Sequence, residues 1–352
     1  MEWPAGSGVF GNRTSTAFAA AKISLAFAKV EARSPIAADL LRVCAFLKAD
    51  AIPEEMFQSG AKERTATLAA VPNDSLKLLT AISVASRHSL LQHQPEHCTF
   101  SIPRLVQVAV QSEMDETQRR WWAEVAVQLL NRAFPLVEYA NWSQCARLVP
   151  HALELAKAID EYDLVFPEAT RLLHQAGYYL LEQGQHKKAE PLLRRALQLD
   201  EILFGSEHPR VAIALNNLAT LLNDSNRVAE AEPLLRRALL IDEASYGPDD
   251  PSVSIDLNNL ATLLQATHRL DEAESLLRRA LQIDTSNFGP HHLRVAIDLN
   301  NLATLLMAAN RLAEIEPLLS RAVNIFERSL GPDHPYTRIG SENYQIIQRE
   351  LA

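Results

Sequence analysis

Four side chains able to bind a metal ion lie close together in the chain: His88, His93, His97 and Cys98. Imidazole and thiolate groups hold zinc when their spacing lets four of them surround the ion. Their successive separations of five, four and one residues match no tetrahedral motif. We therefore interpret them as solvated side chains of a β-hairpin, and we predict neither a metal nor a cofactor.

A second chemical possibility lies at the N-terminus. Gly6 and Gly11 have the separation found in a phosphate-binding loop, but Asn12 and Arg13 stand where that motif requires Lys and Ser or Thr. Without those groups nothing would contact the phosphates or hold magnesium, so we expect residues 1–13 to be an unstructured leader. No nucleophile elbow or zinc-binding helix motif occurs, and we predict a non-enzymatic protein.

Asparagine and threonine recur in a strict pattern. The stretch Asn216–Leu222 returns at 258–264 and at 300–306, a period of 42 residues. An amide both donates and accepts, so these side chains could bind a peptide backbone without reading its sequence, or form a ladder that ties neighbouring repeats together. The candidate groove residues are Asn216, Asn217, Thr220, Asn223, Asn258, Asn259, Thr262, Gln265, Asn300, Asn301 and Thr304.

Arginine pairs recur as well, at 194–195, 236–237 and 278–279. They could bind acidic motifs. However, a glutamate stands four residues before each pair, at Glu190, Glu232 and Glu274, which is the favourable spacing for ion pairs within one helix. We expect a salt-bridged, solvent-exposed face.

The elements that carry these residues are pairs of amphipathic helices. Val211, Leu215, Leu218 and Leu222 mark one apolar face, and a second face follows from residue 231 to residue 239. Each unit ends at a glycine expected to form a left-handed helix cap, at positions 205, 247, 289 and 331. His208 and His334 lie in these loops, and we attribute them to loop geometry rather than chemistry. We predict four units over residues 167–335 and a capping helix over 336–352.

This pattern is that of the tetratricopeptide repeat, and the 42-residue unit with Leu-Asn-Asn-Leu-Ala in its first helix resembles the repeats of the kinesin light chain type. The resemblance implies an all-α fold, a right-handed solenoid. In that family, one face of each first helix lines a concave groove that takes extended peptides or partner segments. The expected function is a protein- or peptide-binding scaffold or sensor module.

The N-terminal part has a different order of elements. We predict a leader and amphipathic helix over residues 1–32, then a module over 33–113 with helices from residues 34, 52 and 75 and one β-hairpin over 89–102. Three helices followed by a hairpin is the order of a winged helix. Residues 114–166 form two helices of an adaptor or degenerate repeat. Its residues Trp121, Trp122 and Trp142 are expected to pack between the module and the array, with ligand stacking as the alternative.

Residues 40–47, 51–55, 88–91 and 101–107 resemble the winged-helix part of bacterial NB-ARC proteins of the STAND ATPase class. The resemblance implies a STAND-type ATPase domain as a possible partner, in cis or in trans, and the ATPase itself lies outside this sequence. The alternative is a DNA-binding regulator with the array as its sensor. Nucleic acid is disfavoured, because the segment Ile102–Glu113 carries one base, Arg104, whereas phosphate contacts need several.

Composition agrees with these expectations. The chain has 352 residues and a formal net charge of −9 at pH 7, which argues against a surface built for nucleic acid. Its three cysteines, Cys44, Cys98 and Cys145, are odd in number and widely spaced, so they favour a reducing compartment over a disulfide framework. No uncharged apolar run reaches the ~18 residues of a membrane span. We expect a cytoplasmic location.

Overall fold

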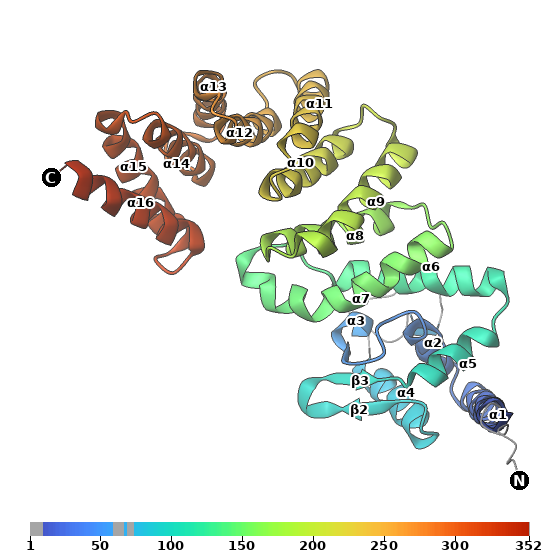
Figure 1. The fold of residues 1–352 in the computed structure, drawn as a ribbon. Helices are drawn as coiled ribbons and strands as arrows, with labels where there is room; N and C mark the ends of the chain where they lie inside the picture. Colours follow the sequence, from blue (N-terminus) through green and yellow to red (C-terminus); the bar gives the residue numbers. More distant parts are fainter. Residues whose placement is uncertain (1–9, 59–66, 69–73, 352) are drawn as a thin grey trace, which may run out of the picture. The chain divides into compact units, whose positions relative to one another are not determined.

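The computed structural model describes residues 10–58, 67–68 and 74–351 (Figure 1). The described part contains sixteen α-helices and one small sheet, so the prediction of an all-α fold with a minor β element is confirmed. The chain forms two compact units, residues 1–182 and 183–352. The division falls inside the first predicted repeat.

The first unit opens with a small α/β module. Its elements are α1 (Phe10–Arg33), α2 (Pro35–Cys44), β1 (Ile52–Pro53), α3 (Glu55–Gln58), α4 (Ser75–Arg87), β2 (Gln92–Gln94), β3 (Thr99–Ser101) and α5 (Arg104–Ser112). The strands are antiparallel in the order β1-β3-β2, with His93 opposite Phe100. This is the element order of a winged helix, and α4 has the predicted bounds.

Two expectations for the N-terminal part of the chain are wrong. Ile52 and Pro53 do not open a helix but form β1, because they pair with Phe100 and Thr99 of β3. Residues 10–13 belong to α1 and not to an unstructured leader. Residues 1–9, which include Gly6 of the rejected phosphate loop, lie outside the described residues.

Helix α5 closes the end of α2 with two glutamines. Gln107 Nε2 donates to the carbonyl oxygens of Cys44 and Leu47 at 2.9 and 2.8 Å, and Gln111 Nε2 donates to that of Ala45 at 2.7 Å. The last carbonyls of a helix have no intrahelical partner, so these side chains satisfy buried acceptors that would otherwise be costly.

Three longer helices complete the first unit: α6 (Glu116–Ala133), α7 (Trp142–Glu161) and α8 (Pro167–Glu182). Asp115 begins α6 with a capping box to Gln118. Arg171 of α8 donates to the backbone carbonyls of Asn131 and Phe134 at 2.7 and 3.3 Å, which ties α8 to the end of α6. The two predicted adaptor helices are therefore present as α6 and α7.

The second unit is a series of antiparallel helix pairs. Its helices are α9 (His186–Phe204), α10 (Pro209–Asp224), α11 (Val228–Tyr246), α12 (Pro251–Ala266), α13 (Leu270–Phe288), α14 (Leu293–Ala308), α15 (Ile315–Leu330) and α16 (Pro335–Leu351). We call α10, α12, α14 and α16 the first helices and α9, α11, α13 and α15 the second helices. Equivalent apolar residues build each interface, such as Val211 and Leu215 against Ile241, and Val253 and Leu257 against Ile283.

Two kinds of turn join these helices. Asn226, His268 and Asn310 follow the first helices in the left-handed α region, with φ of 57 to 60°. The glycines after the second helices, including Gly205 and Gly247, have φ near 90° and ψ near 160°. That is a region open essentially to glycine alone, and not the left-handed helix cap expected from the sequence.

Helix α16 carries a polar face. The 42-residue period places Arg338, Ser341 and Gln345 where α14 has Ala296, Leu299 and Ala303. Those three residues of α14 are buried, whereas Arg338 and Gln345 are exposed and Ser341 is half-buried. A polar face of this kind is typical of a capping helix, and the assignment of α16 as the cap stays a prediction.

Candidate functional site

The first helices form the inner side of the helix pairs. In the second unit α10 contacts α12 and α12 contacts α14 directly, and the second helices are farther apart. Because the first helices lie closer together than the second helices, the side of the array that they form is concave. The constant spacing of 42 residues then brings the recurring asparagines of successive first helices next to one another.

These asparagines form a ladder. Asn216 Nδ2 donates to Asp256 Oδ1, and Asn216 Oδ1 accepts from Asn259 Nδ2 at 3.1 Å. One repeat later, Asn258 Nδ2 donates to Asp298 Oδ1 at 2.6 Å and Asn258 Oδ1 accepts from Asn301 Nδ2 at 2.9 Å. The inter-repeat ladder considered from the sequence is therefore present.

The ladder divides the predicted groove residues. Asn216 is buried with both amide atoms bonded inside the array, and Asn258 is half-buried with both atoms bonded. The threonines donate to the carbonyl four residues earlier, as Thr262 does to Asn258 at 2.9 Å. Ligand contact stays a prediction, and the residues placed best for it are the half-buried Asn217, Asn259 and Asn301.

The ladder ends on buried carboxyl groups that the sequence reasoning missed. Asp256 and Asp298 are 0% and 1% exposed. Burial raises the pKa of each to about 7, and the hydrogen bond from Asn216 or Asn258 opposes the rise. Asp256 faces Asp242 of the preceding second helix, and Asp298 faces Asp284. Burial also raises the pKa of these two partners, to about 6 for Asp242. The sequence signal that could have revealed these buried acids is the recurrence of Asp after 42 residues, at 242 and 284 and at 256 and 298.

The paired carboxyls are confined to two interfaces. The 42-residue period places Ala214 opposite Asp200 at one end and Gly340 opposite Phe326 at the other. A Cβ atom on Gly340 would lie 3.3 Å from Cδ2 of Phe326, so the phenyl ring fills the space that the acid pairs occupy elsewhere. The buried Oδ1 of Asn300 has no partner in the described part of the chain, which is the open end of the ladder.

The outer face carries the predicted ion pairs. Arg194, Arg236 and Arg278 contact the glutamates four residues before them at 2.7 to 2.8 Å. Three further arginines link successive repeats and were not foreseen, although Arg227, Arg269 and Arg311 also recur at 42 residues. Arg269, for example, contacts Glu232 at 2.8 Å and also Glu272. The arginines are thus engaged within the array.

The loop histidines cap helices. Nδ1 of His208, His292 and His334 accepts the N–H of the residue two positions later at 3.1 to 3.2 Å, and Asp250 does the same through its carboxylate at 2.8 Å. A side-chain acceptor at this position satisfies a free helix N–H group. This agrees with attributing the histidines to loop geometry.

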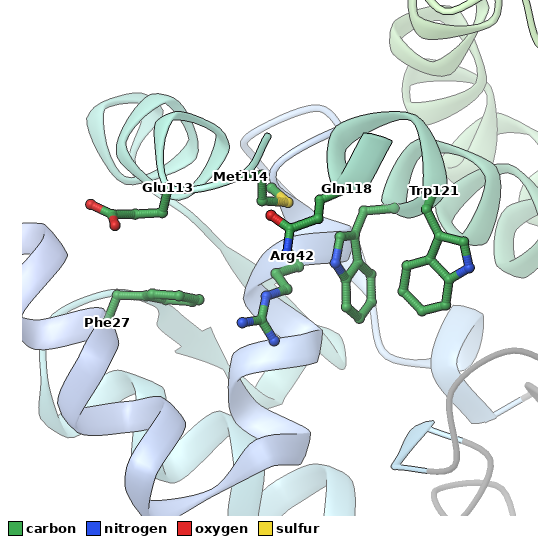
Figure 2. A pocket seen from close by; sticks show the side chains of 7 residues that line it. Phe27, Arg42, Glu113, Met114, Gln118 and Trp121 are labelled. Carbon is green, nitrogen blue, oxygen red and sulfur yellow. The ribbon is translucent and has the colours of Figure 1, made fainter. Parts of the chain in front are cut away.

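A hollow of about 330 Å³ lies in the first unit (Figure 2). Figure 2 shows Arg42 reaching into it between Phe27 and Trp121. The guanidinium lies 5.3 Å from the Phe27 ring centre and 5.5 Å from that of Trp122, and it pairs with Asp39 at 2.8 Å and with Glu31. The cation that lines the hollow is therefore neutralised by two carboxylates and held in cation–π contacts. Trp122 contacts Arg42 of α2 and Trp121 lines the same hollow, and packing of these residues against the array stays a prediction.

The hairpin residues gather no metal-binding set. His93 Nε2 lies 2.8 Å from Glu54 Oε1, and His97 and Cys98 are exposed. Among the described residues no cluster of three or more His, Cys, Asp or Glu side chains could hold an ion. Likewise, none of the described helices is long and apolar enough to cross a membrane.

The module offers few bases to nucleic acid. On the outer side of α4, Lys77 lies 3.9 Å from Asp74, and Leu76 and Leu79 are 70% and 43% exposed. On α5, Val108 is 59% exposed. The exposed Leu76, Leu79 and Val108 give these helices apolar surface, which suits a protein partner better than phosphates.

Comparison with known families identifies the repeats. Residues 168–244, 211–286 and 253–316 match one tetratricopeptide-repeat model and residues 299–336 match another. Residues 28–119 match a domain of unknown function, DUF7779. The chain is a tetratricopeptide-repeat protein that resembles the repeat-bearing part of NB-ARC/STAND proteins.

Individual relatives are distant. A nucleotide-binding leucine-rich repeat (NLR)-like protein of Hyaloscypha variabilis is 25% identical over 198 residues, which cover 54% of this chain and 18% of that protein. The chain thus spans less than a fifth of that relative's length. Repeats of a putative kinesin light chain from Podosopora anserina are 23% identical, with 53% and 89% of the two chains covered and a TM-score of 0.45. A STAND protein with a tetratricopeptide repeat sensor from Pyrococcus horikoshii is 13% identical, with 89% and 56% covered and a TM-score of 0.40.

Proposed function

We propose that this chain is a non-enzymatic, cytoplasmic binding protein that holds an extended peptide or partner segment against the first helices of its array. Tetratricopeptide repeats build protein-interaction scaffolds, and such folds are typically non-catalytic. The observation that supports the inner face as the site is the ladder itself. It fixes the amides of Asn259 and Asn301 with Nδ2 donating inward, which leaves Oδ1 to accept a ligand N–H group.

We also propose that the array acts as the sensor for a STAND-type ATPase, in cis or in trans, with the winged-helix module as the contact. Exposed Leu76 and Leu79 on α4 and Val108 on α5 supply an apolar surface for such a domain. A purified STAND ATPase domain should bind the chain, and Leu76→Ser with Leu79→Ser should weaken that binding. Unchanged binding would exclude this face.

The groove is tested by recovery of partners from a cell lysate. Replacing Asn217, Asn259 and Asn301 with Ala should reduce the recovery of bound proteins relative to the intact chain. A matched control replaces Gln198 and Gln282, exposed amides of α9 and α13, with Ala. If the control and the asparagine variant recover the same proteins in the same amounts, the first-helix face is not the binding surface.

A further inference from the structure

A row of isoleucines runs along the array. Ile213, Ile255, Ile297 and Ile339 stand at 42-residue intervals on α10, α12, α14 and α16. Ile213, Ile255 and Ile339 are 56%, 43% and 50% exposed, and Ile297 is half-buried. A single exposed apolar residue needs no explanation, but the same large aliphatic side chain exposed at equivalent positions of successive repeats marks an interaction surface.

The row lies beside the amides of the proposed groove. Each isoleucine precedes an asparagine by four residues, one helical turn, so that the two side chains share a face. The pairs are Ile213 with Asn217, Ile255 with Asn259, Ile297 with Asn301 and Ile339 with Asn343. Since α10, α12 and α14 pack on one another, the pairs of these helices form a continuous strip, which we call the isoleucine strip.

On α10, α12 and α14 no exposed charged side chain stands between the isoleucine and the asparagine of each pair. One turn beyond the asparagines stand Thr220, Thr262 and Thr304. The nearest bases on the other side, Arg210 and Arg294, lie over the rings of Phe204 and Phe288 at 4.9 and 5.2 Å. In a chain with a net charge of −9, a neutral strip with aliphatic side chains suits an uncharged apolar segment and not an acidic or basic one.

The spacing of the helices selects a conformation. Axes of packed helices lie about 8–10 Å apart. In a polyproline II chain every third side chain returns to the same side after about 9 Å, at ~3.1 Å per residue. In a β-strand, side chains on one face repeat every ~6.6 Å, which does not match. An occupant with one aliphatic side chain per first helix therefore has a period of three residues.

We propose that the isoleucine strip binds an uncharged, polyproline II-like segment of a partner protein that carries an aliphatic side chain at every third residue. The isoleucines contact those side chains, and the asparagine amides bond the peptide backbone between them. This inference rests on the proposed function of the first-helix face and specifies its ligand. The peptide backbone of a polyproline II segment has no internal hydrogen bonds, so its polar groups are open to the asparagines.

The test is a selection of random displayed peptides of about twelve residues, enough to span four first helices, on the full chain. Enrichment of Leu, Ile, Val or Met at a spacing of three, without net charge, is expected. A synthetic peptide of four Leu-Pro-Gln units should bind, and Ile213→Ser with Ile255→Ser should weaken its binding about 25-fold, which is about five-fold per side chain. The control, Ile202→Ser with Leu240→Ser, changes aliphatic residues that are 64% and 66% exposed on second helices and should leave the affinity unchanged.

The outcomes separate the inference from the proposed function. Selection of charged or patternless peptides that require the asparagines but not the isoleucines would overturn the isoleucine strip and leave peptide binding intact. Selection of no peptide at all would overturn both. Self-association of the chain that is lost on Ile213→Ser would show that a second copy occupies the strip, which also overturns the proposal.

Discussion

Replacing one buried aspartate should change how the stability of the array depends on pH. The pKa of Asp298 is about 7 in the folded chain, because burial disfavours its charged form, against an ordinary value of 3.8. Between those values the folded state binds the proton and the unfolded chain releases it, so the free energy of unfolding falls as the pH rises from about 4 to about 7. Asp298→Asn removes this dependence, because an amide stays neutral and its oxygen still accepts from Asn258.

The magnitude follows from the size of the shift. Each pKa unit corresponds to ~1.4 kcal/mol. At pH 5 the buried carboxyl already lowers the free energy of unfolding by the equivalent of about one pKa unit, and at pH 8 it lowers it by the full ~4 kcal/mol. Between pH 5 and pH 8, the free energy of unfolding of Asp298→Asn should therefore rise by about 3 kcal/mol relative to that of the parent chain.

The assay is urea denaturation followed by far-UV circular dichroism at several pH values between 5 and 8. Asp333→Asn, an exposed loop aspartate, is the matched control and should show a constant difference. His151 has a pKa lowered to about 4 by burial and so destabilises the fold as the pH falls below its ordinary 6.5, but it is common to all three chains and cancels. A difference between Asp298→Asn and the parent chain that does not change with pH would refute the reasoning.

Three further results are expected. Gly205→Asn should lower the free energy of unfolding by about 1–3 kcal/mol, because φ of 88° with ψ of 159° is open essentially to glycine alone. The control, Gly184→Asn, should cost little, because Asn226 adopts the same left-handed conformation at the equivalent position of the next repeat. Thermal unfolding of the two variants tests the difference. Gln107→Leu should cost about 2 kcal/mol, because the buried Leu47 carbonyl loses its side-chain donor and the Cys44 carbonyl keeps only the N–H of Leu47. Gln92→Leu on the exposed side of β2 should not cost this, and equal losses in urea melts would contradict the expectation. Phe326→Asp with Gly340→Asp should be less destabilising by at least about 1 kcal/mol than the sum of the single changes at pH 5. Together they supply, for Nδ2 of Asn300, the carboxyl acceptor that Asn216 and Asn258 have in the preceding repeats, and an additive double-mutant cycle would argue against it.

Periodic and local features of this protein were determined by its sequence. The 42-residue recurrence of Asn-Asn-Leu-Ala-Thr-Leu-Leu specifies the helix pairs, because each copy must bury the same apolar face on its neighbours. The spacing of four between Glu232 and Arg236 specifies their ion pair, because both lie on one helix. In the module, the bounds of α4 follow from its Asp74 cap and apolar period.

Features that join distant residues were decided by the tertiary structure. Ile52 and Pro53 read as the start of a helix, but pairing with β3, nearly fifty residues later, makes them a strand. An asparagine side chain can point to solvent or to a neighbour, and only the contact of α10 with α12 turns Asn216 inward to Asp256, forty residues away. The same contact buries the acid pairs and leaves the isoleucines exposed to solvent. Which side chains become buried depends on how closely helices of different repeats approach, and the order of residues within one helix does not fix that distance.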